Sequence, residues 1–201
     1  MVLHVIGIVG GVASGKSFVA AKLRELGAEV LDVDQFGHEV LGEDEVRRAL
    51  CQRWGDRILD SAGQVDRASI ARIVFSPIES SNAELAFLEN LTFPRISGRI
   101  GKRMDDLIAE GSGKVLVLDA AVMTKAGWDK FCNKILYVDS PRDQRLRRAV
   151  ARGWNEAEFD AREAAQVSLD FKRQRAHRVI DNSGSIEQTG RQIEQFWQSL
   201  D

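Results

Sequence analysis

Residues 4–26 read His-Val-Ile-Gly-Ile-Val-Gly-Gly-Val-Ala-Ser-Gly-Lys-Ser-Phe-Val-Ala-Ala-Lys-Leu-Arg-Glu-Leu, and this stretch decides the fold. It contains the pattern G-x-x-x-x-G-K-[ST], whose defining positions are Gly10, Gly15, Lys16 and Ser17. The apolar, β-branched run from Val5 to Val9 precedes the pattern and predicts a buried strand. Apolar residues then recur at helical spacing, which predicts a helix that ends at Gly27.

This context suits a loop that binds a polyphosphate. Glycines let backbone N–H groups turn inward and approach phosphates closely, and the helix N-terminus adds its positive dipole end. Lys16 is expected to reach the β- and γ-phosphates, and the Ser17 hydroxyl to hold Mg²⁺. The alternative is a glycine-rich turn with a chance lysine, but the flanking strand and helix favour nucleotide binding. The expected ATP-binding residues of the loop are Gly10, Gly11, Val12, Ala13, Ser14, Gly15, Lys16 and Ser17.

Composition restricts the class of protein. A chain of 201 residues suits one domain with insertions, and a net charge of −2 gives no general attraction to nucleic acid or anionic membranes. Cys51 and Cys132 match no metal or redox spacing, so we expect two reduced thiols. The first residues lack the basic segment of a signal peptide, and no apolar run is long enough to span a membrane. We therefore expect a cytoplasmic protein.

Residues 28–34 predict a short second strand that ends in Asp32 and Asp34. In an open parallel sheet the ligand crevice lies beyond the carboxyl ends of the strands, so Asp34 and the phosphate loop would face the same crevice. A carboxylate there can accept the proton of an attacking hydroxyl, as a kinase base does. Alternatively, Asp34 caps a helix that starts at Gln35. The phosphate loop upstream favours the catalytic interpretation.

The segment between the second and third predicted strands is helical. We expect helices over 44–53, 67–75 (ended by Pro77), 79–91 and 94–109, with Pro94 in the first turn of the last. This region is too long for a plain crossover. It predicts a helical insertion over about 43–112 that covers the acceptor substrate, although burial in a core would explain the same periodicity.

Two further apolar runs predict the third and fourth strands, over 114–119 and 135–139. The third ends in Asp119, as in a Walker-B strand that delivers a carboxylate near the metal, directly or through water. Many α/β strands end in Asp, so this signal has low specificity. A last strand with a tight turn is expected over 178–184, and an amphipathic helix over 186–200.

Arginines concentrate in a predicted helix over 142–152 and in the next, over 156–168. Guanidinium groups stabilise the charge of a transferring phosphoryl group, so a mobile lid over about 141–170 would account for the cluster. A solvated basic face is the alternative. The residues concerned are Arg145, Arg148 and Arg152 on one helix face and Arg162 in the following helix.

The order of these elements predicts a single α/β domain over 1–201 with a five-stranded parallel sheet. Its core would comprise about 1–42 and 113–201. We expect the P-loop NTP hydrolase fold of the nucleoside-monophosphate-kinase type. This fold has three layers, a helical substrate subdomain and a lid. A GTPase is disfavoured, because no Asn-Lys-x-Asp signature follows the later strands.

Over nearly its whole length the chain resembles the dephospho-coenzyme A kinase family. Residues 7–17 are similar to the family's G-L-T-G-G-I-G-S-G-K-S, and residues 26–34 to its L-G…I-D-A-D element. Residues 119–127 resemble its D-x-P-L-L-F-E-x-G segment, and 180–184 its I-D-N-x-G turn. The arginine-rich helices resemble its Q-L-x-R-x-x-x-R and A-R-I-x-x-Q…K…A-D runs through Leu146, Arg148, Arg152, Ala161, Arg162, Gln166, Lys172 and Ala176.

The resemblance implies that the γ-phosphoryl group of ATP passes to the ribose 3′-hydroxyl of dephospho-CoA, giving CoA and ADP. Asp34 would be the base, and Ser17 would hold the Mg²⁺ that bridges the phosphates. Asn182 lies in the turn that the family places by the adenine. The expected partner is a small molecule, with no nucleic acid or membrane, and the protein a monomer or weak homo-oligomer. The residues that would neutralise the transferring charge are Lys16, Arg148, Arg152 and Arg162.

The chain departs from the family pattern at six positions, which are His38, Phe93, Ala121, Lys125, Arg145 and His177. The family has Arg, His, Pro, Glu, Gln and Asp there, in that order. Several of these positions belong to the acceptor side, whereas the ATP side and Asp34 keep the pattern. Two alternatives therefore stay open: a P-loop kinase of another small acceptor, and a nucleotide-binding regulatory protein without turnover. Asp34 argues against the second, because a non-catalytic protein has no need of that carboxylate.

Overall fold

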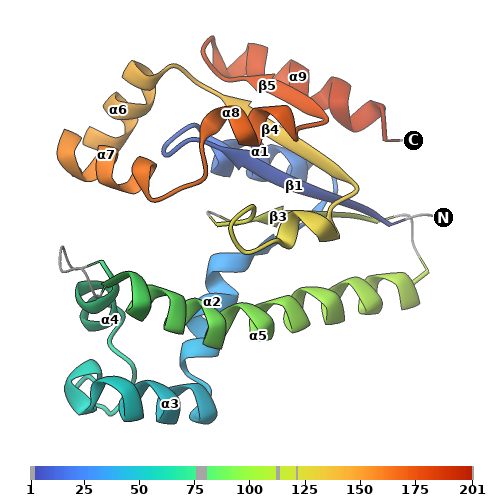
Figure 1. Cartoon of the computed structure of the whole chain (residues 1–201). Helices are drawn as coiled ribbons and strands as arrows, with labels where there is room; N and C mark the ends of the chain where they lie inside the picture. Colours follow the sequence, from blue (N-terminus) through green and yellow to red (C-terminus); the bar gives the residue numbers. More distant parts are fainter. Residues whose placement is uncertain (1–2, 76–80, 112–113, 121, 201) are drawn as a thin grey trace. The chain divides into compact units, whose positions relative to one another are not determined.

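The computed structural model describes residues 3–75, 81–111, 114–120 and 122–200 (Figure 1). Pro77 and Ala121 lie outside these ranges. The chain divides into two compact units, which are Met1–Asp32 with Met104–Asp201, and Val33–Arg103. The expectation that a helical insertion over about 43–112 covers the acceptor substrate stays a prediction.

The first unit contains a five-stranded sheet in the order β2-β3-β1-β4-β5, with every neighbouring pair parallel, as predicted. The strands are β1 (His4–Gly10), β2 (Glu29–Asp32), β3 (Val115–Asp119), β4 (Lys134–Asp139) and β5 (Arg178–Asp181). The register pairs Ile8 with Asp119 and Gly10 with Val138. The carboxyl ends of the three central strands therefore meet at one edge, where the phosphate loop leaves β1.

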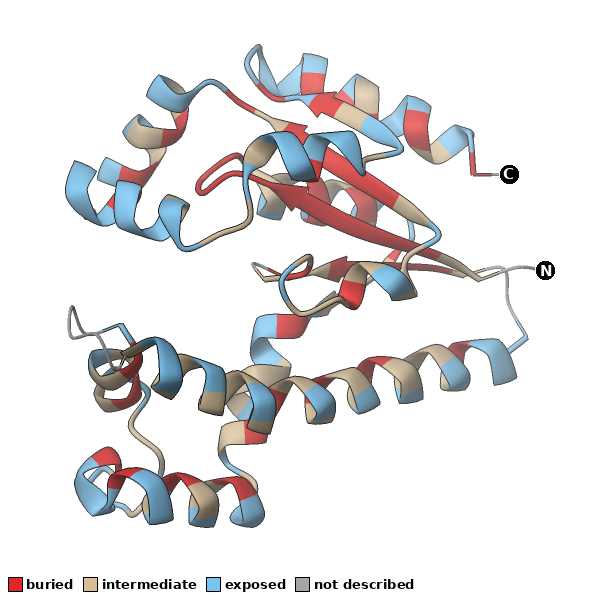
Figure 2. Cartoon of the chain, viewed as in Figure 1, coloured by how far each residue is buried: buried red, intermediate tan, exposed pale blue. Residues whose placement is uncertain are grey.

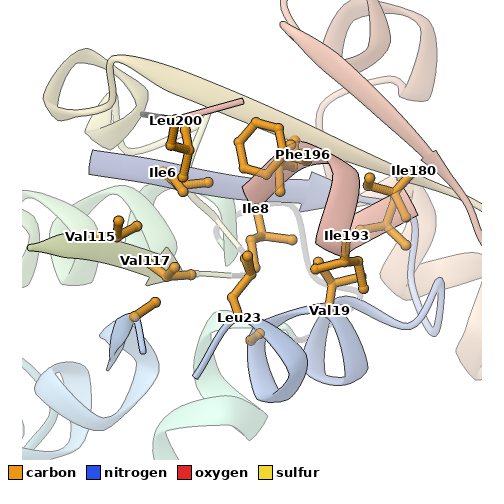
Figure 3. Close-up of a cluster of buried hydrophobic side chains, with 14 residues drawn as sticks. Ile6, Ile8, Val19, Leu23, Val115, Val117, Ile180, Ile193, Phe196 and Leu200 are labelled. Atoms are coloured by element: carbon orange, nitrogen blue, oxygen red, sulfur yellow. The ribbon is translucent and has the colours of Figure 1, made fainter. Parts of the chain in front are cut away.

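One face of this sheet carries a continuous apolar core. Ile6 and Ile8 of β1 are fully buried there, against α1 (Lys16–Glu25) and α9 (Ile186–Gln198). Figure 3 shows Val19 and Leu23 of α1 beside Ile193 of α9. Burying such aliphatic side chains stabilises the fold by about 1.5–3 kcal/mol each. This packing fixes the axis of α1, and with it the direction in which the helix N-terminus points.

The opposite face of β1 is covered by the β3–β4 connection and by α8 (Leu169–Gln174), which packs on β1 (Figure 1). A Cβ atom on Gly7 would lie 2.8 Å from the Cys132 sulfur and 3.0 Å from the Met123 sulfur. The glycine therefore permits the close approach. Because both faces are covered, β1 is buried along nearly its whole length, as Figure 2 shows.

The remaining elements of the first unit are η2 (Trp128–Phe131), α6 (Arg142–Val150) and α7 (Glu156–Ala164). The predicted helix over 156–168 is too long at its C-terminal end, because α7 stops at Ala164. The separate helix α8 follows, with the Ser168 hydroxyl accepting a hydrogen bond from the Phe171 N–H at its N-cap.

The second unit is helical. It contains α2 (Val33–Leu41), α3 (Asp44–Trp54), η1 (Asp56–Ile58), α4 (Arg67–Val74) and most of α5 (Ser81–Ala109). Polar contacts between its elements include an ion pair of Arg99 with Glu43, the N-cap residue of α3, at 2.8 Å. The Trp54 indole N–H also donates to Glu84 at 2.6 Å.

One prediction about this helical region is wrong. Residues 79–91 and 94–109 do not form two helices, because α5 continues through Pro94. Proline removes the backbone donor that would bond the Asn90 carbonyl, and packing of the buried Ile96 and Ile100 keeps the helix continuous despite this loss.

The second strand is also shorter than the predicted 28–34. Its last paired residue, Asp32, lies opposite Asp119, the last residue of β3, so the ladder ends there. Asp34 is therefore neither a strand residue nor the cap of a helix that starts at Gln35. It lies in the first turn of α2.

Candidate functional site

The loop between β1 and α1 has the conformation that its glycines allow. Gly15 is the N-cap residue of α1, with φ = 102°, a left-handed value that disfavours side chains. A Cβ atom there would also lie 2.2 Å from the Asn182 side-chain nitrogen. Helix α1 then begins at Lys16, so the positive end of the helix dipole points toward the loop.

The loop residues fit a phosphate group. Within the described part of the chain, the Ser14 hydroxyl is buried without a hydrogen-bond partner. A buried polar atom without a partner is costly, and a phosphate oxygen would supply one. The positive dipole end of α1 lies at the same loop, because the helix begins at Lys16. Both features favour an anion at the loop expected to hold the ATP phosphates.

Arg148 of α6 reaches the outer side of this loop. Its guanidinium donates to the Ser14 carbonyl at 3.2 Å and to the Ser140 hydroxyl at 2.7 Å. Burial lowers the pKa of Arg148, with smaller contributions from the neighbouring Arg152 and Arg147. The structure thus brings Arg148 to the phosphate loop, where it holds backbone carbonyls in place.

Asn182 also lies against the loop, directly after β5. Its side-chain N–H donates to the Ser14 carbonyl at 2.8 Å, and its oxygen accepts from Thr189 at 3.1 Å. The structure therefore brings together two predicted ATP-binding residues from distant parts of the chain, Arg148 and Asn182, on the same Ser14 carbonyl.

The other predicted arginines have different environments. Arg145 is buried, donates to the Ser140 carbonyl at 3.0 Å and forms an ion pair with Glu163 of α7. Arg152 and Arg162 are exposed, and the Arg162 guanidinium stacks on the Trp154 ring at 4.1 Å. The three arginines predicted on one helix face therefore have different environments. Arg145 and Arg148 form internal hydrogen bonds, whereas Arg152 is exposed to solvent.

A second lysine joins Lys16 beside the loop. The Lys16 ammonium donates to the Gly11 carbonyl at 2.9 Å, and that of Lys172 to the Gly10 carbonyl at 3.3 Å. Burial, and then the charge of Lys16, lower the pKa of Lys172 to about 8. The sequence alone does not assign Lys172 to the site, because Lys172 lies far along the chain from the loop. Its signal in the sequence is its place in the run that resembles the family's A-R-I-x-x-Q…K…A-D pattern.

Both lysines line a small open cavity at the carboxyl end of β1. Its other lining residues are Val9, Gly10, Ala120, Met123 and Thr124. The cavity therefore combines two ammonium groups with the phosphate loop, which suits a compact anion.

The oxygen donors expected near Mg²⁺ occupy suitable positions in the chain. Ser17 is exposed in the first turn of α1, and Asp119 ends β3 at the same edge of the sheet. Mg²⁺ is commonly held by one or two protein oxygens together with substrate phosphates and water, so a hydroxyl and a carboxylate fit it. Asp34, the predicted base, is exposed and belongs to the unit Val33–Arg103. None of the helices in the described part of the chain combines the length and hydrophobicity that a membrane crossing requires.

Comparison with known proteins agrees with the predicted fold. A family model described as dephospho-CoA kinase matches residues 4–188. The dephospho-CoA kinase of Carboxydothermus hydrogenoformans is 37% identical over 196 residues, covering 96% of this chain and 92% of that protein. The crystal structure of TT1252 from Thermus thermophilus superposes with a TM-score of 0.82, 30% identity and full coverage of both chains. Dephospho-CoA kinase from Campylobacter jejuni shares the fold, with a TM-score of 0.66 at 21% identity, covering 99% of this chain and 98% of that one. The chain belongs to the dephospho-CoA kinase family.

Proposed function

We propose that this protein transfers the γ-phosphoryl group of ATP to the ribose 3′-hydroxyl of dephospho-CoA, which gives CoA and ADP. Family membership supports the substrate pair. The observation that carries the chemistry is the phosphate loop itself, where the Ser14 hydroxyl is buried with no hydrogen-bond partner among the described residues, ahead of a helix that starts at Lys16.

In this proposal the loop binds the triphosphate through backbone N–H groups and the Ser14 hydroxyl, and Lys16 contacts the β- and γ-phosphates. Arg148 and Asn182 keep the loop in shape through the Ser14 carbonyl. Arg152 and Arg162 contribute when the segment over about 141–170 closes over the nucleotide.

Ser17 would hold Mg²⁺ directly, and Asp119 would hold it through water. When bound, the ion neutralises charge on the phosphate oxygens during transfer. This chain's own residues supply the hydroxyl and the carboxylate that orient it.

Asp34 is the proposed general base. It follows Asp32, the last residue of β2, by two residues in the chain and lies in the first turn of α2. This carboxylate would accept the proton of the 3′-hydroxyl as the oxygen attacks the γ-phosphorus. The bond to the bridging oxygen of ADP breaks in the same transfer.

The test is a coupled ADP-release assay with purified protein, ATP, Mg²⁺ and a panel of acceptors. Dephospho-CoA should be turned over far faster than adenosine, AMP or pantothenate, and the product should carry its new phosphate on the 3′-oxygen by ³¹P NMR. Lys16→Met should lower kcat by about 10²-fold or more, because it removes charge stabilisation from the transition state. Faster turnover of another acceptor, or nucleotide binding with no turnover, would refute the proposal.

A further inference from the structure

The buried ammonium of Lys172 has an unusual environment. The residue is only 5% exposed, on the helix that packs over β1. Its two hydrogen-bond acceptors are the Gly10 carbonyl, at 3.3 Å, and the Gln166 side-chain oxygen, at 2.6 Å. Both are neutral. Burying a cation among neutral oxygens is unfavourable unless a negative charge joins it at some stage of function.

The charges that face Lys172 come from several elements. Lys16 lies on α1, Arg145 on α6 and Glu163 on α7, and Lys125 lines the adjoining cavity. Glu163 already forms an ion pair with Arg145. The surroundings of Lys172 therefore carry an excess of positive charge. The lowered pKa, about 8, reflects burial first and the charge of Lys16 second.

Lys16 of α1 and Lys172 of α8 line the same cavity at the carboxyl end of β1. Lys16 is the loop lysine that contacts the β- and γ-phosphates in the proposed function. The Lys172 ammonium, beside the Gly10 carbonyl, is therefore placed to contact a phosphoryl group that Lys16 also contacts. Two ammonium groups around one compact anion would resolve the excess charge.

We propose that Lys172 is a second catalytic lysine, which contacts the terminal phosphoryl group of ATP from the side opposite Lys16. This inference rests on the phosphotransfer function proposed above. The ammonium leaves the Gly10 carbonyl when the γ-phosphate enters the cavity, and Gln166 keeps it oriented toward that group. Lys172 thereby stabilises the charge of the phosphoryl group during transfer, and it distinguishes ATP from ADP.

The first test is nucleotide binding without any acceptor. Binding of ATP·Mg²⁺ at pH 8 should take up protons, because contact with an anion favours the charged form of a lysine whose pKa is about 8. Calorimetry in two buffers of different ionisation enthalpy measures this uptake. Wild type should take up more protons with ATP than with ADP, and Lys172→Met should abolish the difference. Equal uptake in wild type and variant would overturn the assignment.

Affinity and turnover give a second readout. Lys172→Met should weaken ATP binding about tenfold and leave the affinity for ADP within about threefold of wild type. It should lower kcat about 10²-fold, because the variant loses a charge-assisted contact that is made in the transition state. Lys130→Met is the matched control, an exposed lysine on η2, and should behave as wild type. A lysine that merely supports the loop would weaken ATP and ADP binding equally, which would also refute the proposal.

The conservative variant Lys172→Arg covers the case in which the methionine variant does not fold. Arginine stays charged at every pH used, so it should keep the preference for ATP but lose the proton uptake at pH 8. The value of kcat/KM for ATP should fall above about pH 8 in wild type and stay level in this variant. Unchanged proton uptake in Lys172→Arg would contradict us. Because binding needs no acceptor, these results stand or fall separately from the identity of the acceptor.

Discussion

The side-chain nitrogen of Asn182 lies 2.8 Å from the carbonyl oxygen of Ser14, 168 residues away in the sequence. Thr189 bonds the Asn182 side-chain oxygen at 3.1 Å and so fixes which end of the amide faces the loop. The turn after β5 is thereby linked to the phosphate loop. The backbone conformation that presents N–H groups to phosphate consequently depends on a contact from the opposite end of the chain.

Replacing this residue with alanine should therefore weaken nucleotide binding. Asn182→Ala leaves the Ser14 carbonyl with fewer donors, so we expect the free energy of unfolding to fall by about 1–2 kcal/mol. The affinity for ATP should fall about tenfold, because the loop is less well ordered before binding. Denaturant unfolding and calorimetry measure the two effects. Arg191→Ala, an exposed change on α9, serves as the control. Unchanged ATP affinity would show that the loop holds its shape without Asn182.

The proposed base can be separated from nucleotide binding. Asp34→Asn removes the proton acceptor but keeps the size of the side chain, so kcat should fall about 10³-fold while the Kd for ATP stays within about twofold. The control is Asp44→Asn, the same change at an exposed position in the first turn of α3. If Asp34→Asn turns over near the wild-type rate, Asp34 serves only as an acidic residue at the start of α2.

Mg²⁺ binding should depend on the Ser17 hydroxyl. Removal of divalent ions with a chelator should abolish transfer, and added Mg²⁺ should restore it. Ser17→Ala should raise the Mg²⁺ concentration at half-maximal rate about tenfold or more, whereas Ser17→Thr, which keeps the hydroxyl, should shift it much less. Titration of the initial rate with Mg²⁺ gives this value. Identical Mg²⁺ curves for Ser17→Ala and wild type would remove Ser17 from the metal site.

The elements that depend on contiguous residues are those that the sequence predicts best. The phosphate loop, β1 and α1 were predicted because strand, glycines and helix are contiguous, and each has its own periodicity or backbone requirement. The same holds for the parallel sheet, since each strand is a short apolar run between helical segments. The structure confirms β1, α1 and the parallel sheet, and the binding of phosphate by the loop stays a prediction.

Long-range contacts could not be predicted in this way. Nothing near Lys172 indicates that it reaches Gly10, and nothing near Arg145 indicates that it is buried against Glu163. Helical spacing placed Arg145, Arg148 and Arg152 on one face, but neighbouring helices decide which of them is buried. Likewise Pro94 indicated a helix start, and packing of the buried Ile96 and Ile100 kept α5 continuous.

Arg145, one of the departures from the family pattern, has a structural explanation that can be tested. Its buried guanidinium bonds the Ser140 carbonyl and pairs with Glu163, so it joins α6 to α7. Arg145→Gln, which installs the family's residue, should lower the free energy of unfolding by about 1–3 kcal/mol, because the Glu163 carboxylate loses its partner.

The matched control is Arg147→Gln on the same helix. Its pair with Asp143 is exposed, so its loss should cost at most about 0.5 kcal/mol. Denaturant unfolding compares the two variants, and kcat of Arg145→Gln should stay within about threefold of wild type. A large loss of kcat with unchanged stability would instead place Arg145 in the chemistry.

His177, a second departure, replaces the family's aspartate at the start of β5. The Nδ1 atom of His177 accepts a hydrogen bond from the Ile135 backbone N–H at 3.0 Å. The backbone N–H of His177 donates to the Ile135 carbonyl at 2.9 Å. The side chain thus extends the β4–β5 ladder by one acceptor. An aspartate carboxylate also offers an acceptor, so we expect the exchange of residues to preserve this interaction.

Accordingly, His177→Asp should leave the free energy of unfolding within about 0.5 kcal/mol of wild type, whereas His177→Ala should lower it by about 1 kcal/mol. His177→Asn, which also carries a side-chain oxygen, should resemble the aspartate variant. Denaturant unfolding orders the three variants, and the exchange rate of the Ile135 amide proton should rise only in His177→Ala. If all three lose stability equally, the acceptor role is wrong, because only the alanine variant lacks a group that can receive the Ile135 N–H.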